Sequence, residues 1–177
     1  MNKILLVIDY QNDFVDGALG FPGAEKLDDG ITKKIEESAT NGYCIVYTLD
    51  THYEDYLNTR EGKALPVPHC IKDSFGWKPY GKTKETLEKY NAICITKETF
   101  GVHPKNLMES ALPDKDVDEI FITGLVTNMC VISNACVFQA RYPQAQIVVD
   151  SSLCASFDPI LHEKTLDVLK GLQVKVI

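Results

Sequence analysis

The sequence predicts an α/β protein, a three-layer α/β/α sandwich with a six-stranded, mostly parallel sheet between two layers of helices. Two observations favour this fold class. Short runs of consecutive apolar residues, typical of strands buried on both faces, alternate with longer segments of helical periodicity. The 177 residues, 45% hydrophobic and 24% charged, also suit a single globular domain over 1–177.

The first predicted strand is the apolar run 3–8, which ends at an aspartate. Apolar residues at every third or fourth position predict a helix over 23–41, and the following glycine is a stop signal. The apolar, β-branched run 43–49 predicts the second strand. Residues 50–80 look irregular, and loops of that length in a compact domain are usually functional.

The third strand is predicted at 91–96. A proline at the first position predicts a short helix over 104–112. The apolar run 118–123 predicts the fourth strand, and the helical pattern of 129–142 ends near a proline.

The predicted fifth and sixth strands, 145–150 and 173–177, enclose a helix over 158–170. Because strands and helices alternate to the end of the chain, we expect parallel strands joined by right-handed crossovers.

Charge and cysteine content narrow the setting. The net charge of −7 argues against a nucleic-acid partner and against binding to a membrane surface. The sequence contains neither a signal-peptide pattern nor an apolar run long enough for a membrane span, so the cytoplasm is the expected compartment. The six cysteines form no CxxC pair, and most should be free, packed thiols.

Polar or reactive side chains follow four of the predicted strands. They are Asp9 after the first, Asp50 and His52 after the second, Lys97 after the third and the turn 124–130 after the fourth. Because ligands of open α/β sheets bind beyond the carboxyl ends of the strands, these groups should share one site.

Cys130 lies where the fourth strand should lead into a helix. A thiol with the reference pKa of roughly 8.5 is mostly protonated at neutral pH. A helix N-terminus, the Lys97 ammonium, or Asp9 as a base could each favour the thiolate. The free backbone N–H groups at the helix N-terminus could also form an oxyanion hole. The alternative is that Cys130 is a small core residue.

Three stretches carry a resemblance to a known family: VIDYQNDFVDGALG at 7–20, ITKETF at 95–100 and ITGLVTNMCVISNA at 122–135. The sequence resembles the isochorismatase-like cysteine hydrolases, and within them most the nicotinamidases (pyrazinamidases). The resemblance implies a catalytic triad of Asp9, Lys97 and Cys130, with a thioester formed on the cysteine.

The resemblance also implies a cis peptide bond before Val126, which would turn its N–H group, with that of Cys130, toward the oxyanion hole. Phe14 and Phe100 match substrate-binding aromatic positions. Leu65 stands where an aromatic pocket residue is usual.

A second cluster could bind a metal. Asp50 and His52 alternate along an extended segment, and Glu61 and His69 follow in the long loop. Carboxylates with imidazoles suit zinc, iron or manganese, although each residue could also be an ordinary loop residue. The resemblance favours a metal: it implies that all four bind a divalent ion (Zn, Fe or Mn), which would hold a pyridine nitrogen. No organic cofactor is implied.

One residue departs from the family pattern, one is a further pocket candidate, and two histidines have no predicted role in the site. Asn128 replaces the aspartate that is frequent in the family, and Trp77 is a further candidate for the pocket. His103 is assigned to a loop and His162 to the surface of the last helix.

The resemblance thus implies hydrolysis of nicotinamide to nicotinate and ammonia. Two alternatives stay open: a metal-free amidohydrolase of this family acting on another small amide or carbamoyl compound, and a non-catalytic dimerising module. The expected partner is a small-molecule amide, with no nucleic acid and no membrane, and family members suggest a homo-oligomer.

Overall fold

The computed structural model describes residues 2–113 and 116–177. Within them, strands form one sheet in the order β3-β2-β1-β4-β5-β6, with every neighbouring pair parallel. The six-stranded α/β sheet is therefore confirmed, and it is parallel throughout rather than mostly parallel. The strands are β1 (Asn2–Ile8), β2 (Cys44–Asp50), β3 (Ile93–Lys97), β4 (Val117–Leu125), β5 (Gln146–Ala155) and β6 (Lys175–Val176).

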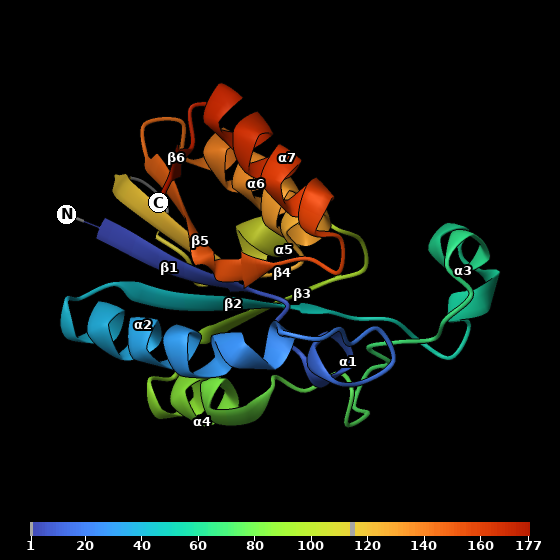
Figure 1. The fold of residues 1–177 in the computed structure, drawn as a ribbon. Coiled ribbons are helices and arrows are strands. Elements are labelled where there is room, and N and C mark those ends of the chain that lie inside the picture. Colours follow the sequence, from blue (N-terminus) through green and yellow to red (C-terminus); the bar gives the residue numbers. More distant parts are fainter. Residues whose placement is uncertain (1, 114–115) are drawn as a thin grey trace.

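Helices cover both faces of the sheet, as the sequence predicted (Figure 1). One layer consists of α2 (Asp28–Thr40) and α4 (Gly81–Lys89), which pack against each other. The other layer consists of α5 (Pro104–Glu109), α6 (Ile132–Arg141) and α7 (Pro159–Gly171).

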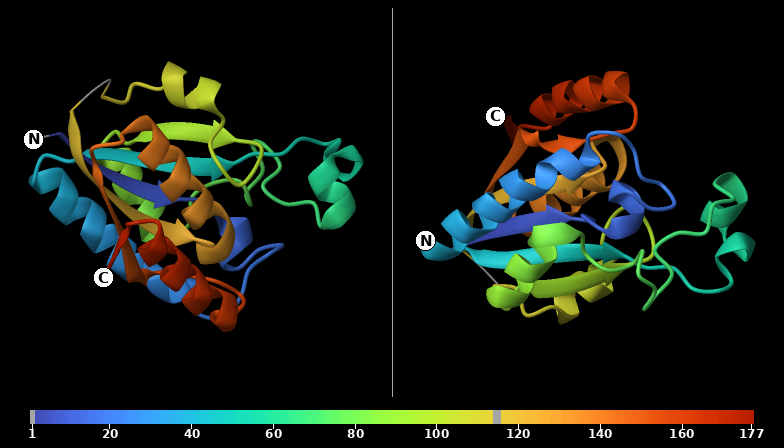
Figure 2. Two further views of the ribbon diagram at one scale, coloured as in Figure 1. Left: turned by 90° about the horizontal axis from the view of Figure 1, so that it is seen from above. Right: turned by 60° about the horizontal axis from the view of Figure 1, so that its bottom comes forward.

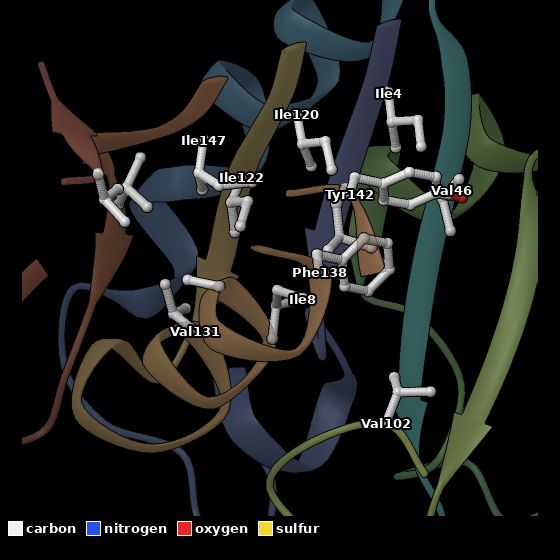
Figure 3. Close-up of a cluster of buried hydrophobic side chains, with 14 of the residues drawn as sticks. Ile4, Ile8, Val46, Val102, Ile120, Ile122, Val131, Phe138, Tyr142 and Ile147 are labelled. Atoms are coloured by element: carbon white, nitrogen blue, oxygen red, sulfur yellow. The ribbon is translucent and has the colours of Figure 1, made fainter. Parts of the chain in front are cut away.

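The core is divided by the sheet because successive side chains of a strand point to opposite faces. In β1, Ile4, Leu6 and Ile8 join the cluster beneath α5, α6 and α7, whereas Leu5 and Val7 join the cluster beneath α2 and α4. Figure 3 shows the first cluster, in which the side chains of α6 lie over those of the central strands.

Several short elements were not predicted. α1 (Asn12–Val15) follows β1, and a 3₁₀ turn (Tyr56–Asn58) with α3 (Arg60–Ala64) lies in the long loop. The helix predicted over 23–41 begins with a 3₁₀ turn (Ala24–Leu27) before α2. The α3 segment projects from the body beyond the carboxyl ends of the strands (Figures 1 and 2). No helix in 2–113 or 116–177 has the length and apolar character of a membrane span.

The strand order places the site. From β1 the chain builds outward to β2 and β3, then returns to the other side of β1 with β4. The crevice at the carboxyl ends of β1 and β4 is thus the point where the direction of winding reverses, which is where ligands bind in open α/β sheets.

Candidate active site

The carboxyl ends of β1 and β4 approach each other closely at Gly124. Its φ of +117° lies in the region that favours glycine, and a Cβ there would lie 2.1 Å from the Ile8 carbonyl oxygen. The residue after Ile8 is Asp9, and the turn after β4 carries Cys130. The backbone therefore brings a carboxylate and a thiol to the same crevice.

Lys97, the last residue of β3, connects these two groups. Its Nζ atom lies 2.7 Å from Asp9 Oδ2 and 3.6 Å from Cys130 Sγ. It also donates hydrogen bonds of 3.0 Å to Asp50 Oδ1 and to the Thr99 carbonyl oxygen. The whole side chain is buried, so the ammonium depends on these protein groups to replace its contacts with solvent.

Asp9 is held in a fixed orientation. Its φ of +43° is left-handed, which is uncommon for a residue other than glycine. Thr48 Oγ1 accepts a hydrogen bond from the Asp9 N–H and donates one of 2.6 Å to Oδ1. Within the described part of the chain, Oδ2 pairs with the Lys97 ammonium but accepts no well-aligned hydrogen bond. That oxygen is therefore available to take a proton.

The cluster does not favour the thiolate form that the sequence suggested for Cys130. Burial raises the pKa of the thiol well above its usual value, and the nearby Asp9 and Asp50 carboxylates add to the effect of burial, whereas Lys97 opposes it. Burial also raises the pKa of Asp9, against the opposing effect of Lys97. The Lys97 ammonium already pairs with two carboxylates, so a third negative charge, the Cys130 thiolate, is not favoured. This charge balance favours the protonated thiol.

Cys130 lies in a π-helical turn, Thr127–Val131, and the Leu125–Val126 peptide bond before it is cis, as the resemblance implied. Asn134, one turn further along, is fully buried. Its Nδ2 donates to the carbonyl oxygens of Cys130 at 2.8 Å and Phe100 at 3.0 Å. Asn134 was not predicted from the sequence; the signal that could have indicated it is a polar residue on the buried face of a helix, four positions after the cysteine.

The four candidate metal ligands come together. One ligand atom from each of Asp50, His52, Glu61 and His69 lies within 4.8 Å of the others. Asp50 Oδ2 is 3.1 Å from His52 Nε2 and 3.4 Å from His69 Nε2, and Glu61 Oε1 is 3.7 and 3.9 Å from the same two nitrogens. Tetrahedral zinc, with bonds of about 2.0–2.2 Å, requires ligand separations of about 3.3–3.6 Å. The set fits a divalent ion.

Neighbouring groups orient His69 and keep Asp50 ionised, as metal binding requires. His69 Nδ1 is 2.8 Å from the Val67 carbonyl oxygen, an arrangement that leaves Nε2 with a lone pair directed at the other ligands. Burial would raise the pKa of Asp50, but Lys97 and the two imidazoles outweigh burial and hold that pKa well below its usual range. Asp50 thus connects the candidate metal site with the Asp9–Lys97–Cys130 cluster.

Both clusters adjoin one cavity of about 560 Å³. The predicted pocket residues Phe14, Leu65 and Phe100 line it, together with Cys130, Val126 and three of the candidate metal ligands. Trp77 is not among its lining residues; the indole donates a hydrogen bond of 2.9 Å to Thr51 Oγ1 instead. The other lining residues are Ala18, Leu19, Gly20, Arg60, Ala64, Met129 and Phe157.

Comparisons with known proteins agree with this geometry. A model of the isochorismatase domain matches residues 3–177. An uncharacterised isochorismatase family protein, PncA of Bacillus subtilis strain 168, is 32% identical, with 92% of this chain and 91% of that protein covered.

Among solved structures, the nicotinamidase/pyrazinamidase PncA of Bacillus subtilis superposes with a TM-score of 0.85 at 28% identity, over 99% of both chains. The pyrazinamidase/nicotinamidase of Streptococcus mutans UA159 gives a TM-score of 0.86 at 26% identity, over 99% of this chain and 100% of that one.

Proposed function

This chain belongs to the isochorismatase family, and from that premise we propose that it is a cysteine-dependent amidase that converts nicotinamide and water into nicotinate and ammonia. The observation that carries the proposal is the contact of one buried ammonium, Lys97 Nζ, with both Asp9 and Cys130 beside the cavity. A cation in contact with both a base and a nucleophile is the arrangement that activated cysteines require.

In the first half of the reaction, Asp9 Oδ2 takes the thiol proton as Cys130 Sγ attacks the amide carbon. The pKa of Asp9 is raised toward neutral pH by burial. A carboxyl group carries protons best when its pKa lies near the working pH. Lys97, whose pKa is raised by the acidic groups around it despite burial, stays charged and stabilises the sulfur as it becomes anionic.

Collapse of the tetrahedral intermediate breaks the C–N bond. Asp9 returns its proton to the departing nitrogen, ammonia leaves and a thioester remains on Cys130. Water, deprotonated by Asp9, then hydrolyses the thioester to nicotinate and regenerates the thiol. The backbone N–H groups of Val126 and Cys130 are the proposed oxyanion donors in both halves.

The choice of nicotinamide rests on the second cluster. A divalent ion bound by Asp50, His52, Glu61 and His69 would supply a Lewis acid for the pyridine nitrogen, and three of these ligands line the cavity that Cys130 also lines. Phe14, Leu65 and Phe100 offer apolar surface to the ring. The structural neighbours named nicotinamidase add support.

Ammonia release from nicotinamide by the purified protein tests the proposal. We expect Cys130→Ala to lower the turnover at least about 10³-fold, because the covalent route is removed. Cys136→Ala is the matched control, since Cys136 is an exposed cysteine of the neighbouring helix. Full activity of Cys130→Ala, or a wild-type protein that releases no ammonia, would refute the proposal.

A further inference from the structure

The turn that carries Cys130 is tied to α7 by side chains that the mechanism above does not use. Thr127 Oγ1 and His162 Nδ1 share a hydrogen bond of 2.8 Å. At the next residue, Asn128 Oδ1 accepts a hydrogen bond of 2.6 Å from Ser156 Oγ. Two consecutive residues of the turn are thus attached to the start of α7 and the segment before it.

His162 is not the surface residue that the sequence suggested. Only 16% of its side chain is exposed, and its ring reaches inward to Thr127, which is completely buried. A buried hydroxyl needs a partner, and the His162 imidazole provides one. The helical pattern of 158–170 places His162 on the helix but cannot reveal what the imidazole touches.

The start of α7 is a firm support for this contact. The Asp158 side chain caps the helix: Oδ1 accepts hydrogen bonds from the N–H groups of Ile160 at 2.9 Å and Leu161 at 3.0 Å. His162 follows directly, so the imidazole is presented from the rigid first turns of a 13-residue helix.

On the other side of the cysteine, Asn134 holds the Cys130 carbonyl oxygen. The turn is therefore fixed after the cysteine by Asn134 and before it by the Thr127–His162 pair. Between Thr127 and Cys130 lie only two residues, so a shift at Thr127 would move both the thiol and the neighbouring Val126 N–H group.

We propose that His162 is a positioning residue for the amidase reaction: by binding the Thr127 hydroxyl it fixes the turn that aims Cys130 Sγ and the oxyanion donors at the amide. This proposal takes its reaction, amide hydrolysis, from the proposed function, whereas the contacts that fix the turn do not depend on that function. A displacement of about 1 Å at reacting groups can cost up to about a hundredfold in rate.

The first test compares Thr127→Val and His162→Ala with wild type in ammonia release from nicotinamide. We expect kcat to fall about tenfold or more while KM changes less than about threefold, because alignment and not binding is lost. His162→Asn should recover most of kcat, since its amide group branches from the same carbon as Nδ1. His103→Ala is the control: its Nδ1 also accepts a hydrogen bond, from the Lys105 N–H, but far along the chain from the turn.

A double-mutant cycle separates this role from a general loss of stability. If the two side chains act through their mutual hydrogen bond, Thr127→Val/His162→Ala should be no slower than the slower single variant. Additive losses, unaltered kcat in His162→Ala at a temperature well below its unfolding, or no recovery in His162→Asn would each overturn the proposal.

A substrate-independent readout distinguishes failure of this proposal from failure of the proposed function. The rate of Cys130 alkylation by iodoacetamide, followed by mass spectrometry, should fall about fivefold or more in His162→Ala because the sulfur loses its alignment with Lys97. If wild type hydrolyses no nicotinamide but this fall is seen, the positioning role stands and the amidase assignment fails. If wild type is active and alkylation is unchanged in His162→Ala, the amidase assignment stands and the positioning role fails.

Discussion

At the scale of single residues, the charge balance of one buried cluster decides how the cysteine behaves. Lys97 is the cation shared by Asp9, Asp50 and Cys130, and it lies within 3.0 Å of both carboxylates. Burial raises the pKa of the thiol, and the Asp9 and Asp50 carboxylates add to that effect because they share the one cation with it. The cluster thus favours a protonated thiol with a base beside it over a resting thiolate.

This balance predicts the pH dependence of Cys130 alkylation in the metal-free protein. A raised pKa means that the thiolate fraction at neutral pH is below that of a free cysteine and continues to increase above pH of roughly 8.5, the reference value. We expect the alkylation rate to increase with pH throughout the range 7–9, followed by mass spectrometry with the exposed Cys136 as internal reference. A plateau already reached at pH 7 would contradict this charge balance.

The same balance predicts a large loss of stability in Lys97→Met. Removing the buried cation leaves the Asp9 carboxylate without its counter-charge and leaves Asp50 to the imidazoles of His52 and His69, and breaking a buried ion pair typically costs about 3–5 kcal/mol. Urea unfolding measures the effect. The matched control is Lys170→Met, which breaks an exposed pair with Asp167 at 2.9 Å and should leave the midpoint nearly unchanged. Equal midpoints for the two variants would show that the buried pairs contribute little.

At the scale of elements, the junction of β1 and β4 depends on the absence of a side chain at Gly124. A Cβ there would overlap the Ile8 backbone, and φ is +117°. We expect Gly124→Ala to destabilise the protein by more than about 1 kcal/mol in urea unfolding and to lower activity, because the two catalytic segments are pushed apart. Gly171→Ala is the control, since a Cβ there would meet no atom within 4 Å and a helix favours alanine.

Elements with an apolar signature could be predicted from the sequence, whereas elements without it, such as α4, could not. All six strands were found because each is an apolar run, with ends shifted by a few residues. No element was assigned to α4 because Leu87 is the only large apolar residue that it buries; Thr83 and Thr86 complete its buried face. That face becomes recognisable only when α2 lies against it.

The same distinction applies to the site. Asp9, Asp50 and Lys97 could be placed together because each is at or just beyond a strand end, and parallel strands end at one edge. Asn134 and His162 could not, because their roles depend on contacts with segments distant in the sequence, the Phe100 loop and Thr127. The sequence suggested a thiolate at Cys130 because it shows neither the full burial of the thiol nor that Asp50 shares the same lysine.

At the scale of the whole molecule, the candidate metal site joins two parts of the protein. Asp50 and His52 belong to the end of β2 and the residues after it, whereas Glu61 is on the projecting α3 and His69 is in the segment that returns to the body. An ion held by all four would therefore tie the α3 segment to the sheet. Because the ligands are separated in the unfolded chain, binding should favour the folded state.

Metal binding should consequently raise the thermal stability of the whole protein. With free Zn²⁺ at about 100 times Kd, a ligand specific for the folded state adds about 2.7 kcal/mol, which scanning calorimetry detects as a higher Tm. Chelation should reverse the shift, and Glu61→Gln should reduce it because one carboxylate ligand and its charge are lost. His69→Ala should abolish it, while His103→Ala, which alters a histidine outside the cluster, should keep it. If Zn²⁺, Fe²⁺ and Mn²⁺ all left the Tm of wild type unchanged, or if His69→Ala shifted as much as wild type, the four residues would not be a metal site. The case for nicotinamide over another small amide would then lose its main support, although the cysteine chemistry would remain.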